Sequence, residues 1–211
     1  MDRIVVATAG DVKFRKHVER SLTNIRCLGY MPVVYDLGDL GFGLVHTPPA
    51  GDLVKGSSGF IPCNFKHDLI RCALELGERV VYLDGDAIIV QAIDDVFNTE
   101  FDVGVTIRTA KEIETYKTNP RVGYFNTGVM FFKQGRATSL FLDQWEARTR
   151  EVGIEQQALN DVVCPFVTYP NHEDHVRCGM ATVKIVECVE YNCFYPDKSR
   201  AKIIHYKNTV K

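Results

Sequence analysis

Two aspartates, Asp84 and Asp86, flank a single glycine within an apolar run of strand type at residues 80–90. In an extended chain, residues two positions apart point to the same face, so both carboxylates would lie on one side of the strand. Like charges at the end of an apolar strand repel each other and lose hydration. A divalent cation bound to a diphosphate would compensate them, because carboxylate oxygens are hard ligands that suit Mg²⁺ or Mn²⁺. Gly85 would let a ligand approach the backbone closely.

The same residues support two other interpretations. Asp-Gly is a common turn pair, so the segment could be an ordinary surface β-turn after a strand. Haloacid-dehalogenase-type phosphatases also carry two such aspartates after an apolar strand, where the first attacks phosphorus and the second acts as acid and base. That phosphatase motif usually lies near the N-terminus, whereas two strand-helix units precede Asp84 in this chain.

The sequence before and after these aspartates alternates strand and helix patterns. A buried strand at residues 3–9 precedes a helix from Val12 to about Leu28, with Asp11 as the expected N-cap and Gly29 as the stop. Residues 37–59 are rich in glycine and are expected to form a long irregular loop. Further strands are expected at residues 31–38, 79–84, 101–107 and 122–133, the last as a strand pair or as one strand kinked around 126–128. Helices are expected at residues 64–77, 136–151 and 155–163. Residues 111–121 are expected to form a polar, mobile loop.

This order of elements predicts an α/β fold with a mainly parallel central sheet, helices on both faces, and a smaller mixed β region in the C-terminal half. In open α/β sheets, ligands bind beyond the carboxyl ends of the strands. Asp36, Asp84 and Asp86 all fall at such ends. We therefore expect these three side chains at one edge of the sheet.

The composition excludes some classes of protein and favours one compartment. The chain has 211 residues and a formal net charge of −2, without the basic excess that would indicate a nucleic-acid partner. Its N-terminus lacks the pattern of a signal peptide, and no apolar run is long enough to span a bilayer. The seven cysteines are odd in number and form no CxxC pair, which predicts free thiols in a reducing compartment such as the cytoplasm.

Residues 82–90, YLDGDAIIV, resemble the DxD motif of GT-A glycosyltransferases, in particular the glycogenin-like and galactosyltransferase-like group classified as family 8. Other motifs of that family follow in order along nearly the whole chain. Residues 3–11 resemble its first strand, which receives the nucleotide base, and residues 64–70 resemble the helix whose basic residue reaches the donor. Residues 125–133 resemble the family's N-[ST]-G-V strand, residues 155–160 its DQDALN segment, and residues 203–206 the C-terminal strand whose histidine ligates the metal.

The resemblance implies a single GT-A domain over residues 1–211, with the Rossmann-like fold of nucleotide-diphospho-sugar transferases. Residues 1–110 would form the nucleotide-binding half and residues 111–211 the acceptor side. It implies an enzyme that moves a sugar from a UDP-sugar donor to a hydroxyl of a glycan or glycoprotein acceptor, with Mn²⁺ or Mg²⁺ as cofactor and with retention of configuration. It also suggests the catalytic domain of a larger viral protein that builds glycans in the host cytoplasm.

The resemblance also assigns roles to individual residues. Asp84, Asp86 and His205 would be the protein ligands of the metal, with Asp84 also at the ribose and Asp86 essential to catalysis. His205 would bind through a neutral ring nitrogen. Gln156 would lie beneath the anomeric carbon, and Lys207 would neutralise the departing diphosphate. The other implied contacts are Ala7, Thr8, Asp36 and Lys66 on the donor, and Asn126, Thr127, Gly128 and Glu155 on the sugar or acceptor.

The chain departs from the family pattern in two places. Glu155 and Gln157 replace the two aspartates of DQDALN, and the final residues read HYKNTVK where the family has a glycine and a KPW sequence. The implied residues also have structural interpretations. Thr8 and Asp36 could cap turns, Lys66 could be an exposed helix residue, and His205 could be a buried core histidine.

Three further hypotheses remain open at the level of the sequence. His172, His175 and Cys178 could form a structural zinc site, although no paired cysteine motif completes it and the segment is more typical of a polar surface loop. A sugar-1-phosphate nucleotidyltransferase shares the broad fold, but it needs a glycine-rich loop after the first strand, and ATAGDVKFRK has few glycines. A catalytically inactive sugar-binding relative is the third, and the presence of all three metal-ligand candidates argues against it.

Overall fold

The computed structural model of the chain describes residues 3–38, 40, 45–46, 65–116, 123–167, 173–195 and 197–206. Its strands are β1 (Ile4–Asp11), β2 (Met31–Gly38), β3 (Val45–His46), β4 (Arg79–Leu83), β5 (Ala87–Ile89), β6 (Val103–Ile107), β7 (Phe125–Lys133), β8 (His175–Cys178), β9 (Ala181–Glu187) and β10 (Ile203–His205). Its helices are α1 (Arg15–Cys27), α2 (Phe65–Leu76), α3 (Ala110–Tyr116), α4 (Arg136–Val152), α5 (Glu155–Val163) and α6 (Cys188–Tyr191), with 3₁₀ turns η1 (Val12–Phe14), η2 (Asp94–Asn98) and η3 (Cys164–Phe166).

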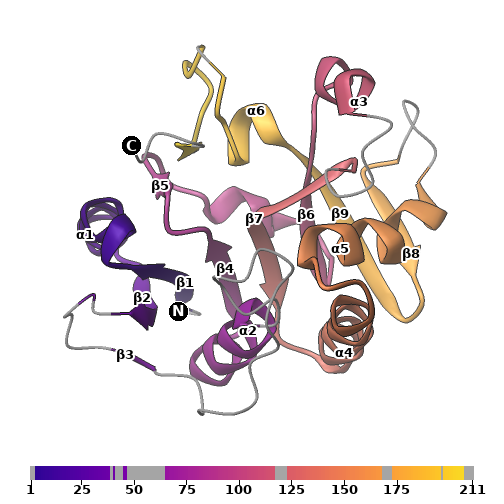
Figure 1. Cartoon of the computed structure of the whole chain (residues 1–211), viewed down its shortest axis with the longest axis horizontal. Coiled ribbons are helices and arrows are strands. Elements are labelled where there is room, and N and C mark those ends of the chain that lie inside the picture. Colours follow the sequence, from indigo (N-terminus) through magenta and orange to yellow (C-terminus); the bar gives the residue numbers. More distant parts are fainter. Residues whose placement is uncertain are drawn as a thin grey trace.

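One large sheet organises the molecule, with strand order β3-β2-β1-β4-β7-β6-β9-β8 (Figure 1). The strands from β3 to β4 run parallel, as do β6 and β9. The antiparallel pairs are β4–β7, β6–β7 and β8–β9, all of which involve strands from the second half of the chain. The predicted mostly parallel α/β sheet with a mixed C-terminal region is confirmed.

Helices cover both faces of this sheet, because neighbouring strand residues point to opposite sides. On one face, Val80 and Tyr82 belong to a core that α2, α4 and α5 close, with Trp145 of α4 fully buried in it. On the other face, Val81 and Leu83 pack with side chains of α1, η2 and α6. Figure 1 shows these helices on either side of the sheet. The strand β4, which leads to the two aspartates, is therefore buried on both faces.

Local signals in the sequence explain most of the element boundaries. The Asp11 side chain accepts a hydrogen bond from the Lys13 N–H, so it caps the 3₁₀ turn η1 that leads into α1. The chain leaves α1 through Gly29, whose φ of 79° lies in the left-handed region that glycine tolerates. The helices expected at residues 64–77, 136–151 and 155–163 are confirmed as α2, α4 and α5.

Three segments expected as loops contain regular structure. The first part of the expected loop 111–121 lies in α3, because Thr109 and Glu112 form a reciprocal capping box: each backbone N–H donates to the other's side chain, at 3.2 and 3.4 Å. The segment with His175 and Cys178, expected as a polar surface loop, forms β8 beside β9. The expected glycine-rich loop includes the short strand β3, and most of its remaining residues lie outside the described ranges.

The strand β7 has a break in register that matches the predicted kink. Opposite β6, the pairing moves from Val105–Met130 directly to Thr106–Asn126, so three residues of β7 have no counterpart. Such irregularities bend a strand and re-aim its side chains, often beside active sites. The kink at residues 126–128 is therefore confirmed as a single irregular strand rather than a strand pair.

Two other expectations concern cysteines and membranes. The six cysteines that the structure describes form no disulfide, in agreement with the predicted thiols. None of the helices in the described ranges has the length and apolar character needed to cross a bilayer.

Candidate active site

Asp84 and Asp86 lie where β4 ends at the carboxyl edge of the sheet. The expected extended conformation at residues 84–86 is wrong, because the Ala87 N–H donates to the Asp84 carbonyl at 2.8 Å and closes a turn. A Cβ on Gly85 would come within 2.4 Å of the Ala9 carbonyl oxygen at the end of β1. The glycine therefore lets the turn pack onto the neighbouring strand. The turn interpretation is correct locally, but the turn belongs to a partly buried site.

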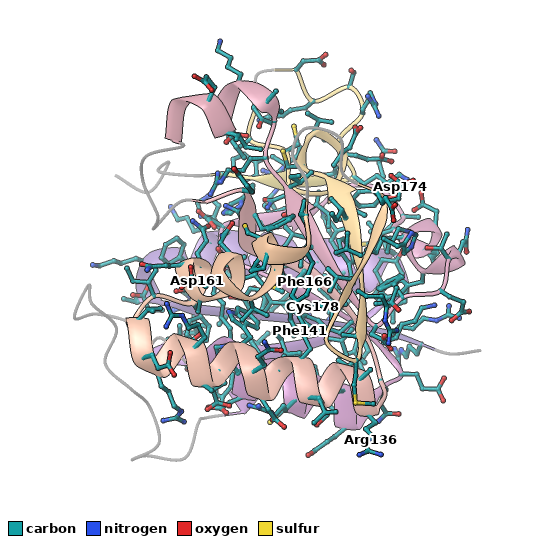
Figure 2. All side chains as sticks on the ribbon, turned by 90° about the vertical axis from the view of Figure 1, so that its right-hand side faces the viewer. Arg136, Phe141, Asp161, Phe166, Asp174 and Cys178 are labelled. Carbon is teal, nitrogen blue, oxygen red and sulfur yellow. The ribbon has the colours of Figure 1, made fainter. Side chains whose placement is uncertain are left out.

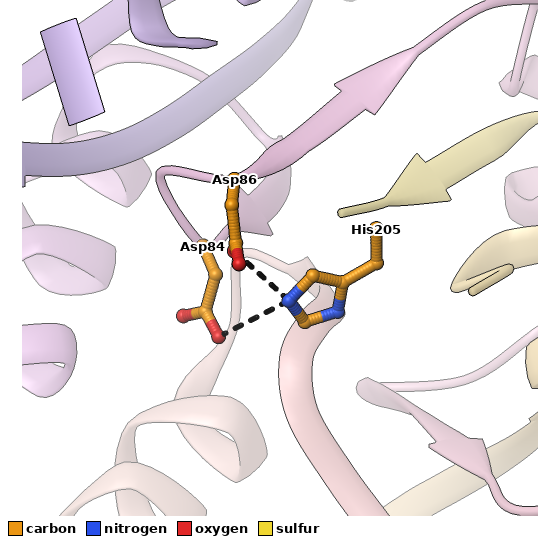
Figure 3. Close-up of side chains that lie close together, drawn as sticks. All are labelled: Asp84, Asp86 and His205. Carbon is orange, nitrogen blue, oxygen red and sulfur yellow. Dashed lines mark ion pairs between the residues drawn. The ribbon is translucent and has the colours of Figure 1, made fainter. Parts of the chain in front are cut away.

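His205 completes a three-residue cluster with the two aspartates (Figure 3). The antiparallel pairing of β10 with β5 places His205 opposite Ala87, and the Tyr206 N–H donates to the Asp86 carbonyl at 2.9 Å. His205 Nε2 lies 2.9 Å from Asp86 Oδ1 and 3.9 Å from Asp84 Oδ2. One ligand atom from each of the three side chains lies within 4.8 Å of the others. The structure thus brings together the three predicted ligands from distant parts of the chain.

The donor set and the space around it fit a divalent cation. Carboxylates are the ligands that suit Mn²⁺ and Mg²⁺, and a neutral imidazole is a common metal ligand. Gly128 faces the same cluster, where a Cβ would come within 2.4 Å of His205 Cε1 and 2.9 Å of Asp84 Oδ2. The missing side chain keeps the approach to both ligands open. Asp84, Asp86 and His205 could therefore hold the ion.

A buried lysine supplies positive charge to the same cluster. Lys66 Nζ on α2 lies 2.9 Å from Asp84 Oδ1 and 3.1 Å from Glu155 Oε1, and it donates to Thr127 Oγ1 at 3.2 Å. Burial favours the neutral amine, but the two carboxylates hold the pKa of Lys66 above its ordinary value. Burial also opposes ionisation of Asp84, yet Lys66 and His205 hold its pKa below the ordinary value. Lys66 is therefore no exposed helix residue.

Tyr82 is a site residue that the sequence analysis did not identify. Its hydroxyl donates to Asp84 Oδ1 at 2.8 Å. Burial, together with the nearby Asp84 charge, raises the pKa of Tyr82, which keeps it a protonated donor. The signal was present in the sequence, because Tyr82 precedes Asp84 by two positions in a strand and such residues share a face.

The sugar-side residues form a connected set. Gln156 Oε1 accepts hydrogen bonds from Asn126 Nδ2 and from Arg108 Nη2, each at 3.2 Å. Arg108 follows β6, is buried, and also contacts Glu112 Oε1 at 3.3 Å. No sequence pattern pointed to Arg108. The structure brings together Gln156 and Asn126, and it adds a guanidinium to them.

Glu155 and Asp161 are the carboxylates of α5. Thr127 Oγ1 donates to Glu155 Oε1 at 3.4 Å, so Glu155 belongs to the cluster around Lys66. Asp161 instead pairs with Arg148 Nη2 of α4 at 2.8 Å. Figure 2 shows Asp161 on the outer face, where α4 and α5 lie side by side. Asp161 is therefore outside the cluster.

The predicted nucleotide-base contacts lie in the middle of β1 and near the carboxyl end of β2. Ala7 is fully buried between Val33 and Tyr82, and its side chain belongs to the core. The Thr8 hydroxyl is buried, and no hydrogen-bond partner for it occurs in the described ranges, so Thr8 does not cap a turn. Asp36 Oδ1 accepts from the Leu40 N–H at 3.1 Å, which is the turn-capping role.

Two sequence hypotheses depend on residues outside the described ranges. Lys207, which was expected to neutralise the departing diphosphate, lies outside them. The zinc hypothesis also depends on one such residue, His172. Of its other two members, His175 Nε2 lies 3.4 Å from Thr99 Oγ1, and the Cys178 thiol donates to the Val162 carbonyl at 3.3 Å. These contacts give both residues structural roles in and beside β8.

Comparisons with known proteins agree with this architecture. A glycosyltransferase involved in the glycosylation of the major capsid of PBCV-1 superposes with a TM-score of 0.65 at 14% identity, over 99% of this chain and 96% of the other. The galactosyltransferase LgtC gives a TM-score of 0.59 at 14% identity, over 98% and 88%. The glycosyltransferase GlyE of Streptococcus pneumoniae gives a TM-score of 0.56 at 15% identity, over 98% of this chain and 56% of the other. These likenesses show a shared GT-A fold.

A sequence search against curated proteins found no match. The family model of the nucleotide-diphospho-sugar transferases matches residues 63–207, which include the Asp84–Asp86 turn, the irregular part of β7, the start of α5 and His205. That match covers more than half of the chain and all three candidate metal ligands. The chain belongs to the nucleotide-diphospho-sugar transferase family and is a glycosyltransferase with the GT-A fold.

Proposed function

We propose that this glycosyltransferase moves a sugar from a UDP-sugar donor to a hydroxyl of a glycan or glycoprotein acceptor, and that it depends on Mn²⁺ or Mg²⁺. One observation carries the proposal: Asp84, Asp86 and His205 converge within 4.8 Å at the carboxyl edge of the sheet. Ligands of open α/β sheets bind at that edge. The family membership adds that the donor is a nucleotide-diphospho-sugar.

The residues of the metal cluster act on the departing diphosphate. When bound, the cation supplies positive charge that stabilises the leaving group. Lys66 favours the ionised form of Asp84, which is the form that ligates. Tyr82 fixes one Asp84 oxygen through its 2.8 Å hydrogen bond. Thr8 of β1 and Asp36 of β2 are proposed to contact the base and ribose, and Lys207 to contact the phosphates.

The sugar side determines where the acceptor attacks. The bond between C1 and the phosphate oxygen breaks, its electron pair leaves with UDP, and the acceptor oxygen bonds to an oxocarbenium-like C1. The acceptor proton passes to the departing phosphate oxygen on the same face. Gln156 is an amide whose oxygen already accepts two hydrogen bonds, so it orients the sugar without removing a proton. This arrangement favours retention of configuration.

The contacts of Asp84 and the converging side chains of Asp86 and His205 favour a glycosyltransferase over a phosphatase or an inactive relative. A haloacid-dehalogenase-type enzyme would use Asp84 as a nucleophile, but here Asp84 Oδ1 is held by Lys66 and Tyr82. The viral origin, the cytoplasmic location and the larger glycan-building protein remain proposals that follow from the sequence. The free thiols are compatible with a reducing compartment.

A thermal-shift series tests the proposal directly. The protein would be heated with UDP, UDP-sugars and other nucleotide-sugars, each with Mn²⁺ and with a chelator. A ligand that binds the native state raises its apparent stability, so UDP-sugars should raise the unfolding temperature only with the metal. The best donor would then be used in a transfer assay with glycan acceptors. Equal shifts with and without Mn²⁺, or shifts with a different nucleotide, would reject the metal or the donor assignment.

A further inference from the structure

The second ring nitrogen of His205 has a buried partner that the proposed reaction does not use. His205 Nδ1 lies 2.7 Å from the Asn192 side-chain oxygen, and Asn192 is fully buried beside α6. The Asn192 amide nitrogen lies 2.8 Å from Asn126 Oδ1 and 2.9 Å from Thr106 Oγ1. Asn192 thus connects the predicted metal ligand to the irregular strand β7.

The direction of these hydrogen bonds follows from one backbone group. The Gly128 N–H, which can only donate, points at the Asn126 side chain at 2.8 Å, so the atom that receives it is an oxygen. The Asn192 atom facing that oxygen must then be the amide nitrogen. The other end of the Asn192 amide, which faces His205, is therefore its carbonyl oxygen. Since that oxygen can only accept, Nδ1 of the ring carries the proton.

Each alternative orientation produces a mismatch. Turning the Asn192 amide would place two acceptor oxygens 2.8 Å apart, because Asn126 Oδ1 would then face the Asn192 oxygen. Turning Asn126 as well would place its NH₂ group against the Gly128 N–H, and would remove the donor that reaches Gln156 at 3.2 Å. Thr106 fits the assigned direction. Its hydroxyl donates to the backbone carbonyl of Asn126 at 3.1 Å, so its oxygen can accept from the Asn192 amide nitrogen.

We propose that Gly128, Asn126 and Asn192 form a hydrogen-bond relay that fixes the tautomer and the orientation of His205. In the neutral ring the proton sits on Nδ1, so the lone pair of Nε2 faces Asp86 Oδ1 at 2.9 Å, and a bound cation would reconcile these two acceptors. That is the form in which imidazole binds a cation, and outer partners of this kind hold a ligating histidine in place. Asn192 is thus a positioning residue. That a cation binds the Nε2 lone pair rests on the proposed function, whereas the tautomer of the His205 ring does not.

Nitrogen NMR of the metal-free protein tests the relay without any reaction. Protein labelled with ¹⁵N-histidine would be studied with a chelator at a pH high enough for the ring to be neutral, and the His205 signals would be assigned by their loss in His205→Gln. We expect a protonated Nδ1 and an unprotonated Nε2. A neutral ring with its proton on Nε2 would overturn the proposal.

Two variants of Asn192 separate positioning from packing. Asn192→Leu removes the acceptor, and it should raise the Kd for Mn²⁺ by roughly 10–100-fold, measured by calorimetry. Asn192→Asp keeps an acceptor for Nδ1, so it should retain the Nδ1-protonated ring, although its second oxygen replaces the amide donor that faces Asn126 Oδ1 and Thr106 Oγ1. Equal affinity in wild type and Asn192→Leu would reject the positioning role. If Asn192→Leu does not fold, the Asn192→Asp variant decides instead: a neutral His205 ring with its proton on Nε2 in that variant would reject the positioning role.

The two readouts also separate this inference from the proposed function. If the wild-type protein has the Nδ1-protonated ring but binds no Mn²⁺, the relay is supported and the proposed metal dependence fails. If it binds Mn²⁺ with the proton of the metal-free ring on Nε2, the relay fails and the metal site is supported.

Discussion

Lys66 Nζ lies 2.9 Å from Asp84 Oδ1 and its side chain is only 5% exposed, so the first aspartate of the predicted metal site has a permanent buried counter-charge. The same amine lies 3.1 Å from Glu155 Oε1. One lysine therefore ties α2 to the end of β4 and to the start of α5. Lys66 balances the charge of Asp84, while His205 Nε2 lies 2.9 Å from Asp86 Oδ1, so the two carboxylates and the ring nitrogen surround one position for a cation.

Replacing Lys66 by methionine should destabilise the protein, because two partly buried carboxylates would lose their buried partner. Breaking a buried ion pair costs about 3–5 kcal/mol. Mn²⁺ should restore part of that loss, since a cation that binds the native state raises its stability. Denaturant unfolding with Mn²⁺ and with a chelator measures both effects. Lys16→Met, at an exposed position on α1, is the control and should change stability by less than about 0.5 kcal/mol. Equal stability of Lys66→Met and wild type in chelator would contradict the buried pair.

Replacing Asp86 by asparagine should leave the fold intact and remove the effect of Mn²⁺ on UDP binding. The variant loses a charged ligand, whereas Lys66 and Tyr82 still hold Asp84. We expect UDP affinity with Mn²⁺ to fall at least about tenfold, which is about 1.4 kcal/mol, by calorimetry. Glu100→Gln removes a fully exposed carboxylate and serves as the control. Unchanged UDP affinity of Asp86→Asn in the presence of Mn²⁺ would contradict the assignment of Asp86 as a metal ligand.

Replacing Gly128 by alanine should block the cation without unfolding the chain. The added Cβ would meet His205 Cε1 at 2.4 Å and Asp84 Oδ2 at 2.9 Å, so both side chains must move. Overpacking of this kind costs roughly 1–3 kcal/mol. Gly135→Ala is the matched control, because a Cβ there meets nothing within 4 Å. Calorimetry with Mn²⁺ should show weaker binding only for Gly128→Ala, and equal binding in the two variants would contradict the close approach.

The ion pairs between α2 and α4 should make stability depend on pH in the acidic range. Glu146 Oε2 lies 2.6 Å from Arg71 Nη1; burial opposes ionisation of Glu146, but Arg150 and Arg71 hold its pKa below the ordinary value. Because the pKa is lowered in the folded state, the stabilisation is present above the unfolded pKa of about 4.3 and is lost as the pH falls through the folded pKa.

Glu146→Gln should therefore be less stable than wild type near neutral pH, and the difference should shrink as the solution becomes acidic. Denaturant unfolding along a pH series measures it. Glu151→Gln, which removes a carboxylate that is 63% exposed, should show little difference at any pH. A Glu146→Gln difference that stays constant from neutral to acidic pH would show that the loss is not electrostatic.

The stereochemistry of the product should be retention. An inverting transferase needs a carboxylate base opposite the leaving group, whereas Gln156 is an amide and Asp161 pairs with Arg148 away from the site. Proton NMR of fresh product reads the anomeric coupling and decides the matter. Asp161→Asn should keep nearly full activity and the same configuration. An inverted product would reject the role of Gln156 and point to Glu155 as the base.

The sequence by itself determined the elements and the edge where the chemistry lies. Strand and helix patterns in the first half predicted a mostly parallel sheet, and parallel strands place Asp36 and the Asp84–Asp86 turn at one edge. The resemblance of residues 203–206 also pointed to His205, and the structure places it beside the aspartate pair; that the three residues bind a metal stays a prediction. The predictions of the elements and of the sheet succeed because they depend on periodicity and on short motifs, which are local properties of the chain.

Only the tertiary structure decided which side chains complete the site. Asn192 and Asn126 are 66 positions apart and Lys66 and Thr127 are 61 apart, yet each pair is in hydrogen-bond contact. Arg108 and Asn192 lie in segments without a recognisable motif, and the break in register of β7 aims Asn126 at both Gln156 and Asn192. Such contacts arise from sheet pairing and burial across the whole fold, because a buried polar group must find a partner wherever the packing places one.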